Sequence, residues 1–467
     1  MKKTLIFTLL CLAGFAFGQI RSVSKKVQEL NSKSQSFENY ALFTKNSDVQ
    51  KSSKFLTSAT DVTVLNINNS ELERINNEAP EYLSLSVPYQ SQMVQVELYK
   101  QNIFTENFVA KDEQGNVIDY QPGQYYRGIV NGDYTSLVGI SFFDDNVMGV
   151  ISTYEFGNII LGKSTDKQDY ITYSDKNLLG ENPFQCGIDE LDHNVDKQQE
   201  ISFDPEMMSK TMTENCVKIY YEIAYRPYQF NGYNIDETMD WITGMHNNIA
   251  ILYDNDNINV ALHAVKIWTT EDPYVTSQMS PGEILSAFAN NMGGQFQGDI
   301  GQLVDSPSST SIAYMDSVCT SNNVSYAGTN TSYQNVPTYS WNIMAMTHEI
   351  GHNLGSPHTH ACAWNGNNTA IDGCGPASGN GEGCNAPLPT DGGTIMSYCH
   401  LVPSVGINFL NGFGSQPGAL IRSTVDSKPC LGTDCSCMFT VQGVEIAYLD
   451  NGNIQAQIVD ETSSEWK

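Results

Sequence analysis

Hydrophobic and polar positions follow different periods in the two halves of this chain. Between about residues 60 and 165, hydrophobic residues recur at every second position in short runs, separated by turn sequences such as Asn131-Gly132-Asp133. A two-residue period bounded by Asn, Gly and Asp is typical of strands with one buried face. The pattern therefore predicts a mostly β domain over these residues.

The second half of the chain alternates between strand and helix patterns. Residues 217–224, 258–268 and 311–318 are hydrophobic runs of strand length. Asn234 and Ser280 each precede hydrophobic residues at three- to four-residue spacing, and each is followed three positions later by Glu, which is typical of a helix N-terminus. Strands and helices in alternation predict an α/β (α+β) domain built on a twisted sheet.

The ends of the chain carry other signals. Residues 1–18 begin with two lysines after Met, continue with an apolar run too short to span a bilayer, and end on small residues. This is the form of a secretory signal peptide, so we expect a secreted, extracellular protein. Residues 20–60 are polar and predict a loosely ordered arm. Residues 433–467 alternate again and predict either a tail or the first strands of a truncated β module.

The composition narrows the range of partners. The chain has 467 residues, which is room for about two or three domains. Its 52 acidic and 24 basic residues give a net charge of −28, which disfavours binding to nucleic acid or to an anionic membrane. Beyond the signal peptide no run of 18 apolar residues occurs, so no membrane span is predicted. Eleven Cys fit an oxidising compartment.

One segment carries candidate metal ligands. A helix is expected from Ser340, as its N-cap, to about Leu354. On this helix His348 and His352 stand four residues apart, so both imidazoles leave the same face about one turn apart. This spacing suits two nitrogen ligands of one tetrahedral zinc ion. The alternative, that both side chains only pack or cap, is weak because the other residues of a zinc site follow in place.

The residues after the helix complete the candidate site. Gly355 can adopt a positive φ and turn the chain back, which brings His358 in as a third ligand. Three neutral imidazoles leave a fourth position open, and an open position marks a catalytic rather than a structural zinc site. Glu349 lies beside His348 and can reach a zinc-activated water as general base without binding the metal. The sequence thus predicts one catalytic Zn²⁺, and it supports no prediction about a structural Ca²⁺.

The segment from His348 to His358 resembles the zinc motif of the metzincin endopeptidases. Within that clan the chain is most similar to the reprolysin family, also called adamalysin or ADAM-type. Residues 258–273 resemble the second strand of that family and the turn after it, and residues 125–132 resemble part of its propeptide. The resemblance spans roughly residues 60–430.

The resemblance implies a latent zymogen. Residues 19–212 would form a propeptide with a β-rich core at about 60–165, residues 213–432 would form the metalloprotease catalytic domain with its zinc-binding helix, and residues 433–467 would follow as the tail. A protein or peptide substrate would lie antiparallel along an edge strand at 311–318. The propeptide would act as the inhibitor, and a monomer is expected.

Residues downstream of the zinc motif take their expected roles from the same resemblance. Met396 would form the Met-containing turn that the clan has beneath its metal. Tyr398 departs from the reprolysin pattern and is similar to a Tyr of astacins and serralysins that can bind zinc and stabilise the transition state. The preferred interpretation is instead a packed turn residue whose hydroxyl finds a local partner. His360 and His400 are expected near the site without binding the metal.

Cys186 is the candidate latency residue. In reprolysins and matrix metalloproteinases a Cys so placed binds the zinc and blocks its open position, and a thiolate is a strong zinc ligand. The alternative is a disulfide from Cys186 to Cys216 across the polar linker at 187–213, which would leave the ten Cys after the signal peptide evenly paired. We favour the cysteine switch, in which case Cys435 or Cys437 could pair with something beyond the chain end.

The remaining cysteines predict disulfides. The resemblance implies a bridge between Cys319 and Cys430. Residues 361–393 are rich in Gly and Asn and have little core, so they need covalent staples. Two local bridges are expected, with their connectivity left open, among Cys362, Cys374, Cys384 and Cys399.

The predicted function is a zinc-dependent endopeptidase that hydrolyses peptide bonds. A hypothesis from another class is a non-catalytic binding or adhesion module that keeps the metzincin fold. The intact Glu349 and the candidate latency residue Cys186 argue against that hypothesis, because a binding module needs neither.

Overall fold

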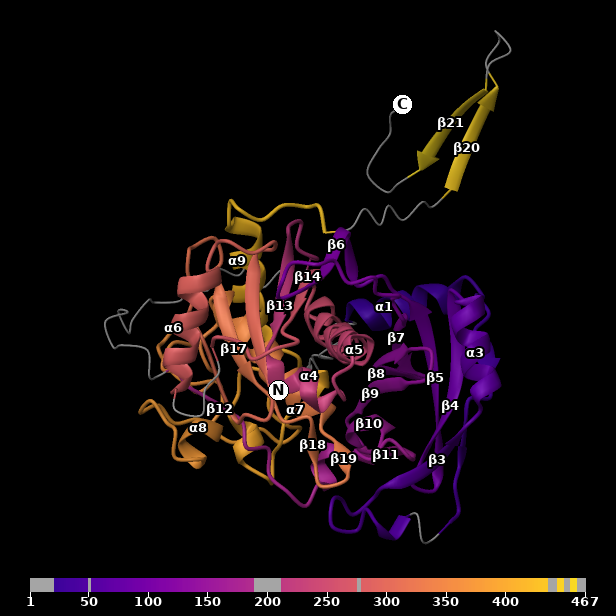
Figure 1. Cartoon of the computed structure of the whole chain (residues 1–467), viewed down its shortest axis with the longest axis horizontal. Helices are drawn as coiled ribbons and strands as arrows, with labels where there is room; N and C mark the ends of the chain where they lie inside the picture. The colour runs from indigo at the N-terminus through magenta and orange to yellow at the C-terminus, as the bar shows by residue number, and fades with distance from the viewer. Residues whose placement is uncertain are drawn as a thin grey trace, which may run out of the picture.

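The computed structural model describes residues 21–48, 52–188, 211–274 and 279–435, and the backbone of residues 443–448 and 454–459. The predicted signal peptide, most of the predicted linker and Cys437 lie outside the described residues. Two large β-sheets flank a central pair of helices (Figure 1). None of the described helices has the length and apolar character that crossing a bilayer requires.

The N-terminal half builds a ten-stranded sheet in the order β1-β4-β5-β7-β8-β9-β10-β11-β3-β2. Neighbours are antiparallel, except β1 and β4, which are parallel. Alternate residues such as Leu83, Leu85 and Val87 are buried in one hydrophobic core, as the two-residue period predicts. The strands are β1 (Glu38–Tyr40), β2 (Phe43–Lys45), β3 (Thr63–Ile67), β4 (Tyr82–Tyr89), β5 (Gln92–Lys100), β7 (Gln124–Val130), β8 (Asp133–Phe142), β9 (Val147–Thr153), β10 (Gly157–Lys163) and β11 (Tyr170–Ser174).

Two helices in this half differ from the sequence prediction. The loosely ordered arm expected over residues 20–60 is wrong, because α1 (Ser22–Ser32) buries Val23, Val27 and Leu30 against the sheet and α5. Its three apolar residues stand at helical spacing, but the polar residues around them mask that period. Inside the predicted β region, α3 (Asn69–Glu78) buries only Leu72 and Ile75 and gives an equally weak signal.

The second sheet has seven strands in the order β12-β16-β17-β15-β13-β14-β6. The strands from β17 to β6 are parallel, β16 is antiparallel to β17, and β12 is parallel to β16. Five strands come from the C-terminal half, namely β13 (Cys216–Ile223), β14 (Asn259–Ile267), β15 (Ile300–Asp305), β16 (Thr310–Ala313) and β17 (Val324–Gly328), and the N-terminal half adds β6 (Phe104–Asp112) and β12 (Gln185–Cys186).

The edge strand predicted at residues 311–318 ends early, at Ala313. Beyond it the chain turns, and the backbone N–H groups of Asp316 and Ser317 donate to the carbonyls of His352 and Asn353, 2.9 and 3.0 Å away. These bonds satisfy carbonyl groups at the end of a helix, which is why the strand does not continue. The turn therefore ties the edge of the sheet to the helix that carries the candidate ligands.

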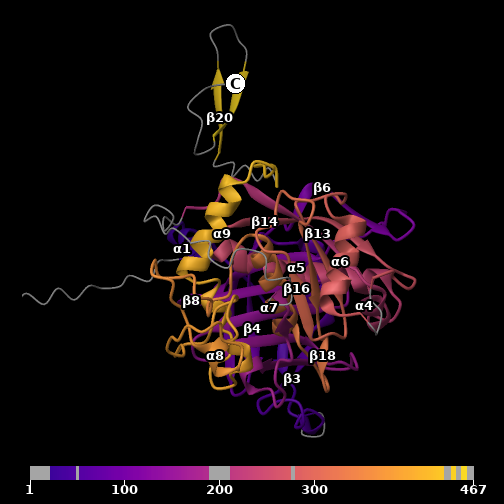
Figure 2. The same ribbon diagram turned by 90° about the vertical axis from the view of Figure 1, so that its left-hand side faces the viewer.

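Helices cover both faces of the second sheet. α5 (Ile235–Asn255) and α7 (Tyr339–Asn353) lie between the two sheets, and α6 (Pro281–Met292) covers the far face (Figures 1 and 2). Both predicted N-caps are confirmed, since Asn234 accepts backbone bonds at α5 and Ser280 forms a capping box at α6. The other elements are α4 (Tyr225–Phe230), α8 (Cys374–Ala377), α9 (Ser415–Ser427), the 3₁₀ helices η1 (Asp175–Asn177), η4 (Cys399–Leu401) and η5 (Phe409–Asn411), and the hairpins β18 (Ser332–Tyr333) with β19 (Val336–Pro337) and β20 (Gly443–Tyr448) with β21 (Ile454–Val459).

The two halves of the chain share structure beyond their contact surface. β6 leaves the N-terminal half and pairs with β14 at the edge of the second sheet. One hydrophobic core contains residues of both halves, such as Ile160 and Met344. An ion pair joins Nη1 of the buried Arg127 to Oδ2 of the partly buried Asp254 at 2.9 Å. A chain cut between the halves therefore still has a large apolar and hydrogen-bonded contact holding it together.

Four disulfides staple the C-terminal half as far as the structure describes it. Cys319 pairs with Cys430, the pair that the resemblance implies. The irregular segment after the zinc motif has two local bridges, and they join Cys362 to Cys384 and Cys374 to Cys399. Cys216 pairs with Cys435. That last bridge excludes the alternative of a disulfide from Cys186 to Cys216, and it gives Cys435 a partner inside the chain, so the outside partner considered for Cys435 is wrong.

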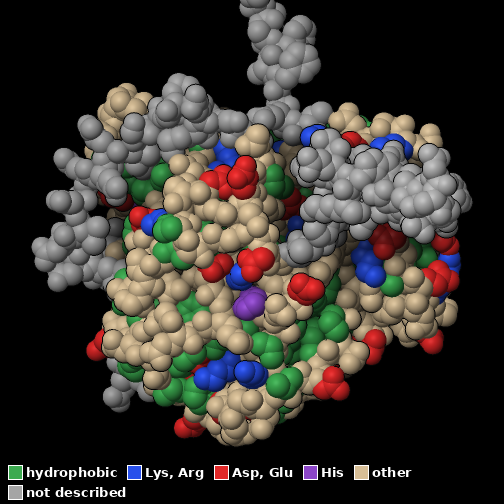
Figure 3. Space-filling model, turned by 90° about the horizontal axis from the view of Figure 1, so that it is seen from above, with side chains coloured by type: hydrophobic (Ala, Val, Ile, Leu, Met, Phe, Trp, Pro, Cys, Tyr) green, Lys and Arg blue, Asp and Glu red, His purple; other side chains and the backbone are tan. Residues whose placement is uncertain are grey.

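The surface agrees with the acidic composition. On the face shown in Figure 3, Asp and Glu side chains are scattered, and the Lys and Arg side chains lie in small separate groups.

Candidate metal centre

The helix α7 is buried on all sides, because it lies between the two sheets. It begins at Tyr339, so the expectation that Ser340 caps it is wrong. Thr338 is the N-cap, makes no capping bond with its side chain, and leaves Ser340 buried in the first turn. At the other end the chain reverses at Gly355, whose φ of 91° is the left-handed conformation expected there.

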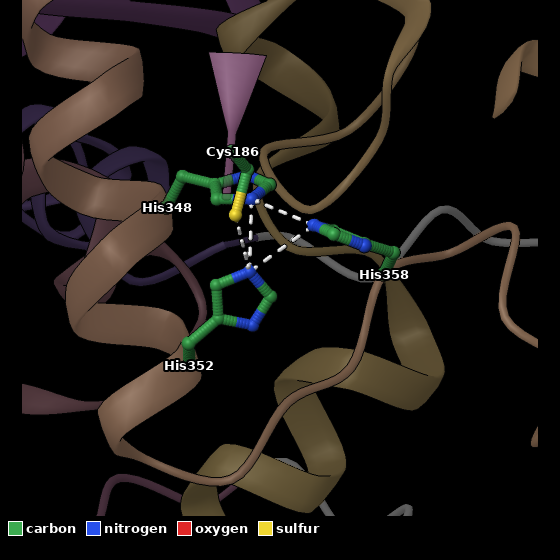
Figure 4. A group of neighbouring side chains, drawn as sticks. All are labelled: Cys186, His348, His352 and His358. Atoms are coloured by element: carbon green, nitrogen blue, oxygen red, sulfur yellow. Dashed lines mark hydrogen bonds between the residues drawn. The ribbon is translucent and has the colours of Figure 1, made fainter. Parts of the chain in front are cut away.

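Three imidazoles converge after this reversal (Figure 4). The Nε2 atom of His352 lies 3.0 Å from that of His348 and 3.2 Å from that of His358, and the third separation, between His348 and His358, is also 3.2 Å. All three side chains are buried. The structure thus brings together nitrogen atoms of three residues that are four to ten positions apart in the sequence.

The outer nitrogens of two rings show how these imidazoles are protonated. Nδ1 of His348 lies 2.8 Å from the carbonyl oxygen of Ile395, and Nδ1 of His352 lies 2.7 Å from that of Ser356. Because a carbonyl only accepts, both Nδ1 atoms carry the proton and both Nε2 atoms present lone pairs. Burial lowers the pKa of His352 to about 4 and those of His348 and His358 well below their usual value, so the rings are neutral.

This donor set fits a zinc ion. Lone pairs that face one another at such distances repel unless a cation lies between them. In a tetrahedral zinc site the ligand nitrogens are separated by about 3.3 Å, since zinc–nitrogen bonds are about 2.05 Å long. The three observed separations of 3.0 to 3.2 Å are close to that value. We conclude that the residues present match the geometry and the chemistry of this metal.

Cys186 supplies a fourth donor to the same point. Its Sγ atom lies 3.4 Å from Nε2 of His352 and within 4.8 Å of the other two ligand atoms. The side chain is buried and takes part in none of the four disulfides. Its segment is held by β12, where Gln185 N and Gly187 N donate to the carbonyls of Ser309 and Ser311, each at 2.7 Å.

The carboxylate of Glu349 is also buried at this site. Its Oε2 accepts a long bond from the Cys186 thiol at 3.9 Å, and its Oε1 has no hydrogen-bond partner among the described residues. Burial raises the pKa of this carboxyl group well above its usual value. A raised pKa makes the carboxylate a stronger base than a solvated glutamate is.

Met396 packs directly against the ligand helix. A Cβ atom at position 351 would lie 2.7 Å from the Sδ atom of Met396, so a larger residue there would force the Met396 side chain to move. The carbonyl of Met396 accepts a bond from Thr359 N at 3.0 Å, next to the third imidazole. The sequence shows Gly351 in the motif, but its steric reason becomes visible only when Met396 is in place.

Tyr398 lies over the site with its ring 4.6 Å from that of His358. Its hydroxyl donates to the carbonyl of Cys186 at 3.1 Å. The partner is therefore a backbone group 212 residues away in the sequence, rather than a local one. A hydroxyl in this position points at the segment that covers the metal site.

Two further imidazoles surround the cluster. His360 stacks on His358 with 4.8 Å between ring centroids, and His400 lies 3.0 Å from the carbonyl oxygen of Phe184, to which its Nε2 donates. Burial lowers the pKa of each to about 4. Neither ring joins the convergent nitrogens. The contact of His400 with Phe184 has no signal in the sequence, because it links residues 216 positions apart.

Three neutral imidazoles and a buried carboxylate meet at one point, an arrangement that is able to hold a hydrolytic metal ion. Residues 216–404 match the reprolysin-type family model described as Metallo-peptidase family M12. This part of the chain is a reprolysin-like metzincin domain, and the chain is a metalloendopeptidase. The matched segment holds the three imidazoles, and Cys186 lies outside it.

Proposed function

We propose that this chain is the secreted, latent precursor of a zinc endopeptidase, with residues 19–212 as its propeptide and residues 213–432 as its catalytic domain. One observation carries the proposal. The three imidazoles, the Glu349 carboxylate and the Cys186 sulfur meet at a single buried point, although Cys186 lies 163 residues before Glu349 in the sequence. A binding module has no use for a base and a blocking thiol in that arrangement.

The residues of the chain divide the work of hydrolysis. Zinc held by His348, His352 and His358 would supply Lewis-acid chemistry toward the scissile carbonyl. Glu349 takes a proton from the attacking water and later delivers it to the leaving amine. No covalent intermediate with the protein forms. The hydroxyl of Tyr398 donates to the backbone carbonyl of Cys186 in the closed chain. Once that segment leaves, the same hydroxyl could donate to a substrate carbonyl.

The segment around Cys186 accounts for latency in two ways. Its sulfur takes the position that a water needs in the active enzyme. Its strand, β12, pairs with the edge strand β16, the place expected for the substrate backbone. β12 runs parallel to β16, opposite to the antiparallel direction expected of substrate, so the segment covers the site without presenting a cleavable bond in register.

Cleavage of an unfolded protein tests the proposal. The chain would be cut by limited proteolysis within residues 189–210, diluted at pH 7.5 until sedimentation shows that the two fragments have separated, and then incubated with casein. We expect cleavage by protein that contains one zinc per chain, loss of cleavage after chelation, and recovery when zinc alone is returned. A folded, zinc-loaded protein that cuts neither casein nor a broad peptide mixture would instead support the non-catalytic binding module.

Release of the propeptide should depend on pH through Asp240 of α5. Its Oδ1 accepts a bond from Tyr120 of the N-terminal half at 3.0 Å, and burial raises its pKa from 3.8 to about 7. Release of the propeptide returns the carboxyl group of Asp240 to water and its pKa to the usual value of 3.8. Between these two pKa values the closed chain therefore binds one proton more than the separated fragments. Association is therefore strongest below about pH 4 and weakens as the pH rises toward 7.

The cut chain offers a direct measurement of this effect. We expect the two fragments to dissociate roughly tenfold more readily at pH 7.5 than at pH 5, as followed by sedimentation, with the full shift reduced by solvent screening. Asp240→Asn should remove most of the difference, whereas Asp236→Asn on the same helix should keep it. Equal pH dependence in wild type and Asp240→Asn would contradict the assignment.

A further inference from the structure

Phe184 is buried in the candidate active site, although it belongs to the N-terminal half. Only 3% of its side chain is exposed. Its ring centroid lies 5.3 Å from that of the ligand His348 and 5.1 Å from that of His400. Its carbonyl accepts the Nε2–H of His400 at 3.0 Å. A side chain and a backbone group of one residue are thus both bound by the catalytic half.

The place that Phe184 fills is a pocket of the C-terminal half beside the metal ligands. One wall is the imidazole of His348, whose orientation is fixed because its Nδ1 donates to the carbonyl of Ile395. The facing wall is His400, in the turn after Met396. Next to it lies a cavity of about 440 Å³, which is bordered by His400 and Met344 of the C-terminal half and by residues of the N-terminal half such as Asp175. Departure of the N-terminal half would leave this pocket open and lengthen it.

The direction of the chain assigns the pocket to one side of the cleaved bond. β12 runs parallel to β16, and a substrate is expected to run antiparallel to the same strand. When two chains pass the same metal site in opposite directions, the residues that precede the site in one chain lie where the residues that follow it lie in the other. Phe184 precedes Cys186, so it stands where an antiparallel substrate places the residue that follows the scissile bond.

We propose that Phe184 occupies the specificity pocket as a substitute for a substrate side chain, and that the enzyme cleaves peptide bonds on the amino side of aromatic residues. The inference rests on the proposed endopeptidase function and adds the substrate class to it. The two imidazole walls favour a flat ring, because its edge-to-face contact with His348 and its tilted contact with His400 stabilise it beyond the burial of apolar area. His400 holds the backbone of that residue and so fixes the depth of its ring.

Sequencing of cleavage products tests the substrate class. The full chain, zinc-loaded and cut within residues 189–210, would digest a peptide mixture prepared from an unfolded proteome. We expect Phe and Tyr as the first residue of the new amino termini at least fivefold above their frequency in the mixture. Cleavage with no such enrichment, or with enrichment on the other side of the bond, would overturn the inference and leave the endopeptidase function intact. No cleavage at all would overturn both.

A second readout uses the uncut chain and requires no activity. If the pocket anchors Phe184, then Phe184→Ala should let the covering segment open and should raise the rate of Cys186 alkylation at least tenfold. Phe184→Leu should raise it much less, because an apolar side chain of similar volume remains. Phe230, which is 44% exposed, offers a matched control through Phe230→Ala. An alkylation rate in Phe184→Ala equal to that of the wild type would overturn the anchoring role and the inference with it.

Discussion

Replacing Glu349 with Gln should lower kcat/KM for casein-derived peptides by about 10³-fold while the zinc content stays at one per chain. The amide keeps the shape of the side chain but cannot accept a proton from water. The carboxylate is buried beside the ligand nitrogens, and its Oε1 has no hydrogen-bond partner among the described residues, so it is positioned for this task. The long bond that its Oε2 accepts comes from the Cys186 thiol of the covering segment. The measurement is a pair of progress curves with metal analysis of both proteins.

The chain provides a matched control for this substitution. Glu382 is an exposed carboxylate near His358 and His360, on the segment stapled by the Cys362–Cys384 bridge. Glu382→Gln changes the charge by the same amount and should leave kcat/KM within about twofold, because exposed charges contribute little. Equal cleavage by wild type and Glu349→Gln would place the general base elsewhere and would contradict the proposed mechanism.

The residues of the metal centre could be predicted because their geometry is local. Four residues make about one helical turn, so His348 and His352 must share a face wherever the helix lies. Gly355 closes the helix with a conformation that other residues adopt only at a cost, and this brings His358 back within six residues of His352. The same local logic explains the two N-caps at Asn234 and Ser280.

The contacts that cover the centre could not be predicted, because no local rule fixes them. The hydroxyl of Tyr398 reaches a carbonyl 212 residues away, and His400 reaches Phe184 across 216 residues. β6 reads as one more strand of the N-terminal half, but it pairs with β14 of the other sheet. A strand pattern predicts which face of a strand is buried, but it does not predict which strand pairs with it. The sequence therefore does not show that the two halves share a sheet.

These nonlocal contacts bear on how the proposed precursor would be held inactive. The thiol of Cys186 accounts for one donor at the metal site, while Phe184, Gln185 and Gly187 bind the same segment through a buried ring and two backbone bonds. β6 and the shared core bind the rest of the N-terminal half. Latency is therefore expected to weaken in steps as these contacts are removed, rather than to vanish with a single one.

Replacing Cys186 with Ser should raise cleavage by the uncut chain about 100-fold, which corresponds to a loss of about 2.8 kcal/mol from the closed state. A serine hydroxyl stays protonated at neutral pH and is a poor zinc ligand, whereas a thiolate binds zinc strongly. The remaining contacts of β12 and Phe184 should keep activity below that of the cut enzyme, so Cys186→Ser combined with Phe184→Ala should be more active than either. Gln185→Ser, on the exposed side of the same strand, is the control and should stay latent. If uncut Cys186→Ser holds zinc and remains as inactive as the wild type, then the strand and the ring block the site by themselves and the thiol is not what keeps it closed.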